Sequence, residues 1–216
     1  MTDVLERPSI ALHGIRTVTG RYVIGNNAAQ PGVNLFGCRL RMISSDAFRV
    51  TAPVIPEQGE VVTASFGPLG TLSGLVEHQF EDGFVVALAQ DPAARDKLNQ
   101  RITGFSERLW TGKLDRRADR RFMPRNPRTV ISRPDSWSHP CLVLDYSRVG
   151  AALSAAFQPE VGEVVTVGQI TAEVMRLFDV GFAVRFFEPQ DPDQIEARLE
   201  APDEWRAMVR QSNGRA

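Results

Sequence analysis

Apolar and polar residues alternate in short runs along most of the chain, and glycine, proline or asparagine separates one run from the next. This pattern predicts antiparallel strands, because successive side chains of a strand face opposite sides of a sheet and turn residues end it. In the first half the expected strands are 15–24, 33–43, 48–51, 60–66, 72–80 and 84–89. In the second half they are 129–132, 141–144, 150–155, 163–167, 170–177 and 181–186.

A helix is expected after each set of strands. Asp91 and Pro92 suit the N-cap and the first turn of a helix, and apolar residues at helical spacing continue to about Trp110. Asp191 and Pro192 occupy the same place in the second half. The expected apolar positions of the second helix are Ile195, Leu199, Trp205 and Val209.

The second half repeats the first. The run Gly-Glu-Val-Val-Thr occurs at 59–63 and again at 162–166, and the same offset places Cys38 on Cys141 and Ser44 on Ser147. Such a repeat indicates two copies of one structural unit. The predicted fold class is therefore mainly β, with two tandem six-stranded antiparallel β-barrels, each followed by a helix.

The expected divisions are a first barrel with its helix at 9–112, a connector at 113–128 and a second barrel with its helix at 129–216. The connector carries seven Lys or Arg residues and two Asp residues, which leaves a local charge of +5. Such a run is a candidate site for an anion. Taken alone, it is also compatible with a solvated tether.

The composition is that of a globular protein. Of the 216 residues, 43% are hydrophobic and 24% are charged, and the net charge is −1. No apolar run reaches membrane-spanning length and the first residues lack a signal-peptide pattern, so we expect a cytoplasmic protein without membrane insertion. Cys38 and Cys141 fall in apolar runs and are predicted to be buried thiols.

Two short motifs carry the candidate chemistry. Arg121 and Arg125 lie four residues apart, and further along the chain Asp145, Ser147 and Gly150 form a polar segment between two apolar runs, which we interpret as a turn. Arginine forks match phosphate oxygens and the O6/N7 edge of guanine, while a carboxylate and a hydroxyl can pair with the ring N–H donors. Each motif alone is common in proteins.

Together, the two motifs resemble the two-part signature of PilZ domains, small six-stranded antiparallel barrels that bind the bacterial second messenger cyclic di-GMP. The resemblance covers the second half of the chain, and the first half only through the repeat. It implies that Arg121 and Arg125 embrace the phosphates and stack on or pair with the guanines. It also implies that Asp145 and Ser147 hold a guanine edge, and that Gly150 lets the strand approach the ligand without a Cβ.

The spacing alone does not decide which arginines form the motif. Arg120 matches the position that, in the PilZ family, helps to decide whether one ligand molecule or a stacked pair is bound. Arg116 and Arg120, or Arg117 and Arg121, have the same four-residue spacing. We prefer Arg121 with Arg125, because the connector must end where the first strand of the second barrel begins.

The first copy departs from the motif. The repeat aligns Met42 with Asp145 and Ala47 with Gly150, and only Ser44 is kept. We therefore expect that the first barrel does not bind the nucleotide and instead docks on the second barrel or on a partner.

The resemblance implies a cyclic di-GMP receptor, and because the arginines lie in the connector we expect binding to cause an interdomain change for a protein partner. The resemblance implies control of motility, biofilm or exopolysaccharide. An alternative is a PilZ-like adaptor that acts without nucleotide. A nucleic-acid binder is disfavoured, because only Phe122 interleaves the basic run. The histidines are isolated and no nucleophile–base pattern occurs, so we expect no enzyme, no metal and no cofactor besides the ligand.

Overall fold

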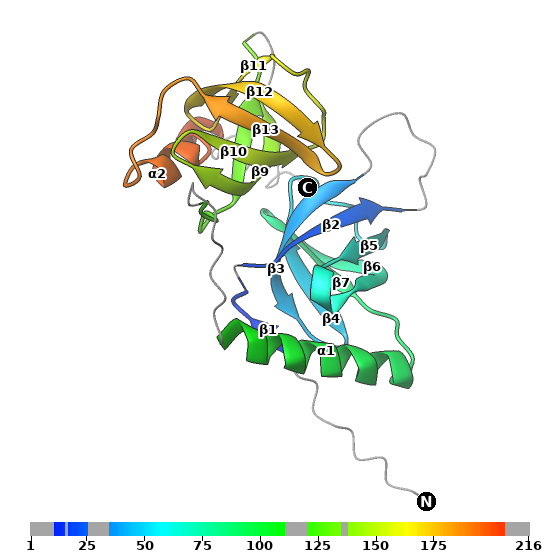
Figure 1. Cartoon of the computed structure of the whole chain (residues 1–216). Coiled ribbons are helices and arrows are strands. Elements are labelled where there is room, and N and C mark those ends of the chain that lie inside the picture. The colour runs from blue at the N-terminus through cyan, green and yellow to red at the C-terminus, as the bar shows by residue number, and fades with distance from the viewer. Residues whose placement is uncertain (1–10, 16, 26–34, 111–120, 135–137, 206–216) are drawn as a thin grey trace, which may run out of the picture.

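Two closed β-barrels follow one another along the chain, each succeeded by a helix (Figure 1). The computed structural model describes residues 11–15, 17–25, 35–110, 121–134 and 138–205. The predicted fold class, tandem six-stranded antiparallel barrels, is confirmed. The first half of the predicted basic connector, 113–120, lies outside the described residues.

The first barrel has the strand order β1-β3-β2-β5-β6-β7-β4, and the pairing of β3 with β4 closes it. The 3-10 helix η1 (Gly67–Leu69) connects β5 to β6. β1 was not predicted as a strand of its own, because two residues show no alternation. The strands are β1 (Leu12–His13), β2 (Thr19–Ile24), β3 (Phe36–Ile43), β4 (Ala47–Thr51), β5 (Val61–Ser65), β6 (Thr71–Phe80) and β7 (Gly83–Ala87).

The second barrel closes in the order β10-β13-β12-β11-β8-β9. Its six strands confirm the predicted set, but β9 is longer at both ends than the sequence indicated. Asp145 and Ser147 therefore belong to a strand, and the predicted turn contains only Arg148 and Val149. The strands are β8 (Arg128–Ser132), β9 (His139–Ser147), β10 (Gly150–Ala155), β11 (Val164–Val167), β12 (Ile170–Phe178) and β13 (Gly181–Phe186).

Matching β-bulges support the repeat. The register between β3 and β4 shifts past Arg41, and the register between β9 and β10 shifts past Leu144, at the same offset as the repeated sequence. A second bulge in each barrel lies at Glu77 in β6 and at Met175 in β12. Because a bulge bends its strand and is a local feature of the backbone, equal placement indicates that the two barrels are copies of one unit.

The helices differ between the copies. α1 (Pro92–Trp110) begins as predicted, and the side chain of Asp91 accepts a hydrogen bond from the N–H of Ala94 at 2.7 Å. The second helix was predicted to begin at Pro192, but α2 covers only Ile195–Leu199. Pro202 soon follows α2, where a proline disfavours helix at the residue before it. Val209 lies outside the described residues, and among the described helices none is both long and apolar enough to cross a membrane.

Both cysteines are free and fully buried, as predicted, one in the core of each barrel. Burial raises the pKa of the Cys141 thiol to about 12 and raises that of Cys38 still more. Since only the thiolate reacts with disulfide reagents, neither thiol is reactive in the folded protein near neutral pH.

We therefore expect that a thiol reagent such as 5,5′-dithiobis(2-nitrobenzoate) at about pH 8 leaves the native protein unlabelled, because the thiols are both protonated and inaccessible. Unfolding in guanidinium should expose both cysteines, and the absorbance of the released thiolate measures the label. Rapid labelling of either cysteine in the native protein would contradict this burial.

Candidate functional site

The β9–β10 hairpin carries the predicted polar motif. Ser147 pairs with Gly150 across the hairpin, and Asp145 pairs with Ala152. The hydroxyl oxygen of Ser147 accepts a hydrogen bond from the N–H of Val149 at 3.4 Å, which helps to hold the two-residue turn. Since alternate residues of a strand share a face, Asp145 and Ser147 present their side chains on the same side of β9.

A hollow of about 200 Å³ lies on this face. It brings together three of the predicted residues from β9 and β10 with one arginine of the connector. The residues that line it are Arg121, Asp145, Ser147, Val149, Gly150, Ala151, Ala183, Val184 and Arg185.

Arg121 and Asp145 join the two predicted motifs. A guanidinium nitrogen of Arg121 lies 2.9 Å from Oδ1 of Asp145, and the two side chains are 43% and 30% exposed. An ion pair this exposed contributes about 0–1 kcal/mol to stability. The pair is therefore weak enough to be exchanged for a ligand that offers an anion to the arginine and N–H donors to the carboxylate.

The described end of the connector runs along β9. Phe122 and Tyr146 form two backbone hydrogen bonds of 2.8 and 2.9 Å, and their rings stack with centroids 5.8 Å apart. The carbonyl oxygen of Pro127 accepts a hydrogen bond from the N–H of Val143 at 2.7 Å. We call residues 121–127 the arm. The sequence alone was compatible with a solvated tether, but in the structure this part of the connector is bonded to β9, whose backbone groups the sequence pattern does not reveal.

Arg125 is not among the residues that line the hollow. The backbone N–H of Arg125 donates a hydrogen bond to a carboxylate oxygen of Glu196. Burial, followed by Glu196, raises the pKa of Tyr146, and the charge of Arg125 opposes this rise. Arg120 lies outside the described residues.

Gly150 has a structural reason for being glycine. A Cβ at this position would clash with the carbonyl oxygen of Val184 on the neighbouring strand β13. The resemblance implies that this glycine lets the strand approach the ligand. The geometry shows that the spacing of β10 and β13 already requires it.

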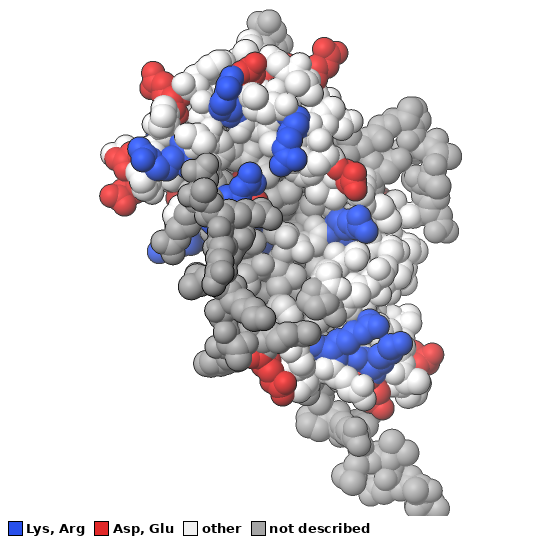
Figure 2. Space-filling model, viewed as in Figure 1, with Lys and Arg blue, Asp and Glu red and all other residues white. Residues whose placement is uncertain are grey.

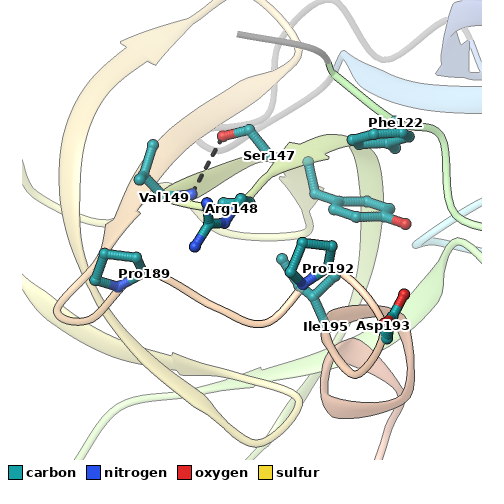
Figure 3. A pocket seen from close by; sticks show the side chains of 9 residues that line it. Phe122, Ser147, Arg148, Val149, Pro189, Pro192, Asp193 and Ile195 are labelled. Carbon is teal, nitrogen blue, oxygen red and sulfur yellow. Dashed lines mark hydrogen bonds between the residues drawn. The ribbon is translucent and has the colours of Figure 1, made fainter.

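A second and larger pocket, of about 650 Å³, lies on the other side of the Arg148–Val149 turn. Figure 3 shows its side chains, which come from the arm, the hairpin and the segment after β13. It shares Ser147 and Val149 with the hollow. Sequence reasoning missed this pocket, although Tyr146 inside the motif was a possible signal. The lining residues are Phe122, Tyr146, Ser147, Arg148, Val149, Pro189, Pro192, Asp193 and Ile195.

The equivalent hairpin of the first barrel keeps only the turn. The hydroxyl of Ser44 accepts hydrogen bonds from the N–H groups of Asp46 and Ala47 at 3.2 and 3.1 Å. Met42 stands where the second barrel has Asp145, so this hairpin has no carboxylate at that position. Across the described residues, no three His, Cys, Asp or Glu side chains are grouped so that they could hold a metal ion.

Neither a protein-family model nor a curated protein matches the chain. Several solved structures do match. One is the Borreliella burgdorferi PlzA protein in complex with c-di-GMP, with 14% identity, a TM-score of 0.26 and coverage of 90% of this chain and 93% of that chain. The Bacillus subtilis inhibitor of motility, MotI/DgrA, has 14% identity, a TM-score of 0.26 and coverage of 94% and 99%. The K. pneumonia MrkH–c-di-GMP complex has 10% identity, a TM-score of 0.25 and coverage of 97% and 100%.

Similarity at these scores decides nothing about function, which has to be argued from this chain's own residues. The closed six-stranded barrel and the meeting of the two motifs agree with the resemblance to PilZ domains.

We expect Gly150→Ala to destabilise the protein by about 1–3 kcal/mol, because its methyl group forces β10 and β13 apart. Gly104→Ala is the matched control, since a Cβ there meets nothing within 4 Å and the position is inside α1. That control should be neutral or stabilising by up to about 1 kcal/mol. Denaturant unfolding measures both variants, and equal stability of the two would show that the strand spacing tolerates a side chain at 150.

Proposed function

We propose that the protein is a receptor for cyclic di-GMP and that the ligand binds on the second barrel at the β9–β10 hairpin. The observation that carries this proposal is the Arg121–Asp145 ion pair of 2.9 Å, which brings the arginine motif and the polar motif to one hollow. Neither motif is specific alone, but their meeting around Ser147 supports the ligand that the resemblance implies.

In the bound state, Arg121 turns its guanidinium from Asp145 to a phosphate or to the O6/N7 edge of a guanine. The freed carboxylate of Asp145 then accepts hydrogen bonds from the N–H donors of a guanine, with Ser147 beside it. Arg125 and Arg120 supply further positive charge from the arm and from the residue before it. Arg121 and Asp145 thus exchange their exposed ion pair for contacts with the ligand.

A ligand of the size of cyclic di-GMP requires both the hollow and the second pocket. Sites for ligands of drug size have volumes of roughly 300–1,000 Å³. The hollow has about 200 Å³ and the second pocket about 650 Å³, and they adjoin at Ser147 and Val149. Cyclic di-GMP has two guanines, so one base occupies the hollow and the other lies toward the pocket that contains Phe122, Tyr146 and Arg148.

Binding changes the relation between the barrels, because the arm belongs to the connector that joins them. A ligand that contacts both Arg121 and Asp145 links the arm to β9 more firmly than the exposed ion pair does. The ligand can shift the population from one arrangement of the two barrels to another only if it binds one of them more tightly. A protein partner that recognises one arrangement then reads the signal.

One observation favours a second function, a PilZ-like adaptor without nucleotide: Arg121 and Asp145 already satisfy each other. A calorimetric titration with cyclic di-GMP separates the two, since it reports both affinity and stoichiometry.

Binding of nucleic acid agrees less well with the distribution of charge. On the face shown in Figure 2, the described Lys and Arg side chains are scattered over both barrels with acidic ones among them, whereas nucleic-acid binders concentrate positive charge in one patch.

We expect Arg121→Ala and Asp145→Ala each to weaken the binding of cyclic di-GMP by roughly tenfold to a hundredfold, because each removes a charge-assisted contact worth about 1.5–3 kcal/mol. Isothermal titration calorimetry measures the affinity. Arg133→Ala is the matched control: Arg133 forms an ion pair of 2.5 Å with Glu163 elsewhere on the same barrel. Its loss should leave the affinity unchanged, and equal effects of all three variants would remove the site from this hairpin.

We also expect cyclic di-GMP to slow amide hydrogen exchange across 121–128 and to change the distance between the barrels in small-angle scattering, since the ligand joins the arm to β9. Tight binding without a change in either measurement would leave the binding site intact but exclude the interdomain switch.

A further inference from the structure

Arg39 is a charged residue of the first barrel that is buried where this barrel meets the arm and β9 of the second barrel. It lies in the middle of β3 and has no solvent-exposed surface. Its guanidinium extends to the place where the arm meets β9. One terminal nitrogen donates to the carbonyl oxygen of Pro124 at 2.8 Å, and the other donates to the carbonyl oxygens of Leu144 at 2.6 Å and Val143 at 3.2 Å.

The backbone of the arm explains why an arginine is needed at this place. Val143 donates its N–H to the carbonyl oxygen of Pro127, and in a regular antiparallel pair the N–H of residue 127 would return the bond. Proline has no N–H. The carbonyl oxygen of Val143 therefore lacks its strand partner, and Arg39 supplies the donor instead.

The adjacent bulge adds a second acceptor. Leu144 is the extra residue in the register between β9 and β10, and a bulge disrupts the local ladder. Arg39 donates to the carbonyl oxygen of Leu144, the residue directly before Asp145. One guanidinium thus bonds to the arm on one side and to the strand that carries Asp145 on the other.

The electrostatics agree with this placement. Burial, and then the neighbouring Arg41, lowers the pKa of Arg39 to about 10, while Asp145 acts in the opposite direction. Arg39 therefore stays charged at neutral pH and lies close enough to Asp145 to attract it. A buried charge costs less when it is hydrogen-bonded: the two terminal nitrogens of Arg39 donate to three carbonyl oxygens, while its Nε is buried without a partner among the described residues.

We propose that Arg39 is a positioning residue for the site on the second barrel: it holds the arm in register with β9 so that Arg121 and Asp145 face the same hollow. The site is then built from both barrels, and the first barrel does more than dock. The effect on cyclic di-GMP rests on the proposed function, whereas the effect on the arm does not.

The experiment compares the full-length Arg39→Met variant with Arg101→Met. Arg101 also donates to a backbone carbonyl, that of Leu69 at 3.2 Å, but within the first barrel. Without ligand, amide exchange of Phe122 and Tyr146 is followed by NMR. In Arg39→Met we expect their exchange to be at least tenfold faster, while in Arg101→Met it stays as in the parent protein. Cyclic di-GMP affinity, measured by calorimetry, should fall about tenfold in Arg39→Met alone.

Arg39→Lys is the second variant, and it serves if the methionine variant does not fold. An ammonium can donate to these carbonyl oxygens but lacks the planar fork, so exchange and affinity should lie between those of the parent and Arg39→Met. Unchanged exchange at Phe122 and Tyr146 in the Arg39 variants would overturn the proposal, and so would faster exchange with unchanged affinity. If the parent protein binds no cyclic di-GMP, the proposed function fails, and the exchange rates still decide the role of Arg39.

Discussion

The candidate site depends on the backbone pairing between the arm and β9. A residue of the connector reaches Asp145 only because Phe122 is bonded to Tyr146 on β9, one residue beyond Asp145. The arm continues the line of β8 along the same strand, interrupted where Pro124 and Pro127 remove donors and where Leu144 forms a bulge. Everything charged at the site, including the Arg121–Asp145 pair, is arranged around this imperfect extension of the barrel.

Much of the fold could be predicted, because the alternation is a local signal and the repeat is visible when the two halves of the sequence are compared. The six strands of the second barrel, the start of α1 and the pair of buried thiols all follow from residues close together in the sequence. Of the candidate site, only residues that belong to the two motifs could be predicted. Arg121 and Asp145 do meet, while Arg125 is not among the residues that line the hollow.

What the sequence could not show arises from packing between distant segments. Arg39 alternates with Cys38 and Leu40 in β3, so the pattern favours solvent exposure for it. In the structure all of Phe36 to Leu40 is buried, since one face of β3 lies in its own core and the other meets the second barrel, where the N–H of Gly37 bonds to Ser154 at 2.8 Å. The attachment of the arm was missed for the same reason, since its partners lie on β9.

The Arg148–Val149 turn divides the candidate site into two adjoining compartments, the hollow and the second pocket. For a ligand made of two linked nucleotides, occupation of one compartment places the second half beside the other at a high effective concentration. A mononucleotide gains no such advantage, whichever compartment it enters. Selectivity for a dinucleotide over the cellular pool of single guanine nucleotides can therefore arise from the spacing of two modest sites across one hairpin, without a tight contact in either.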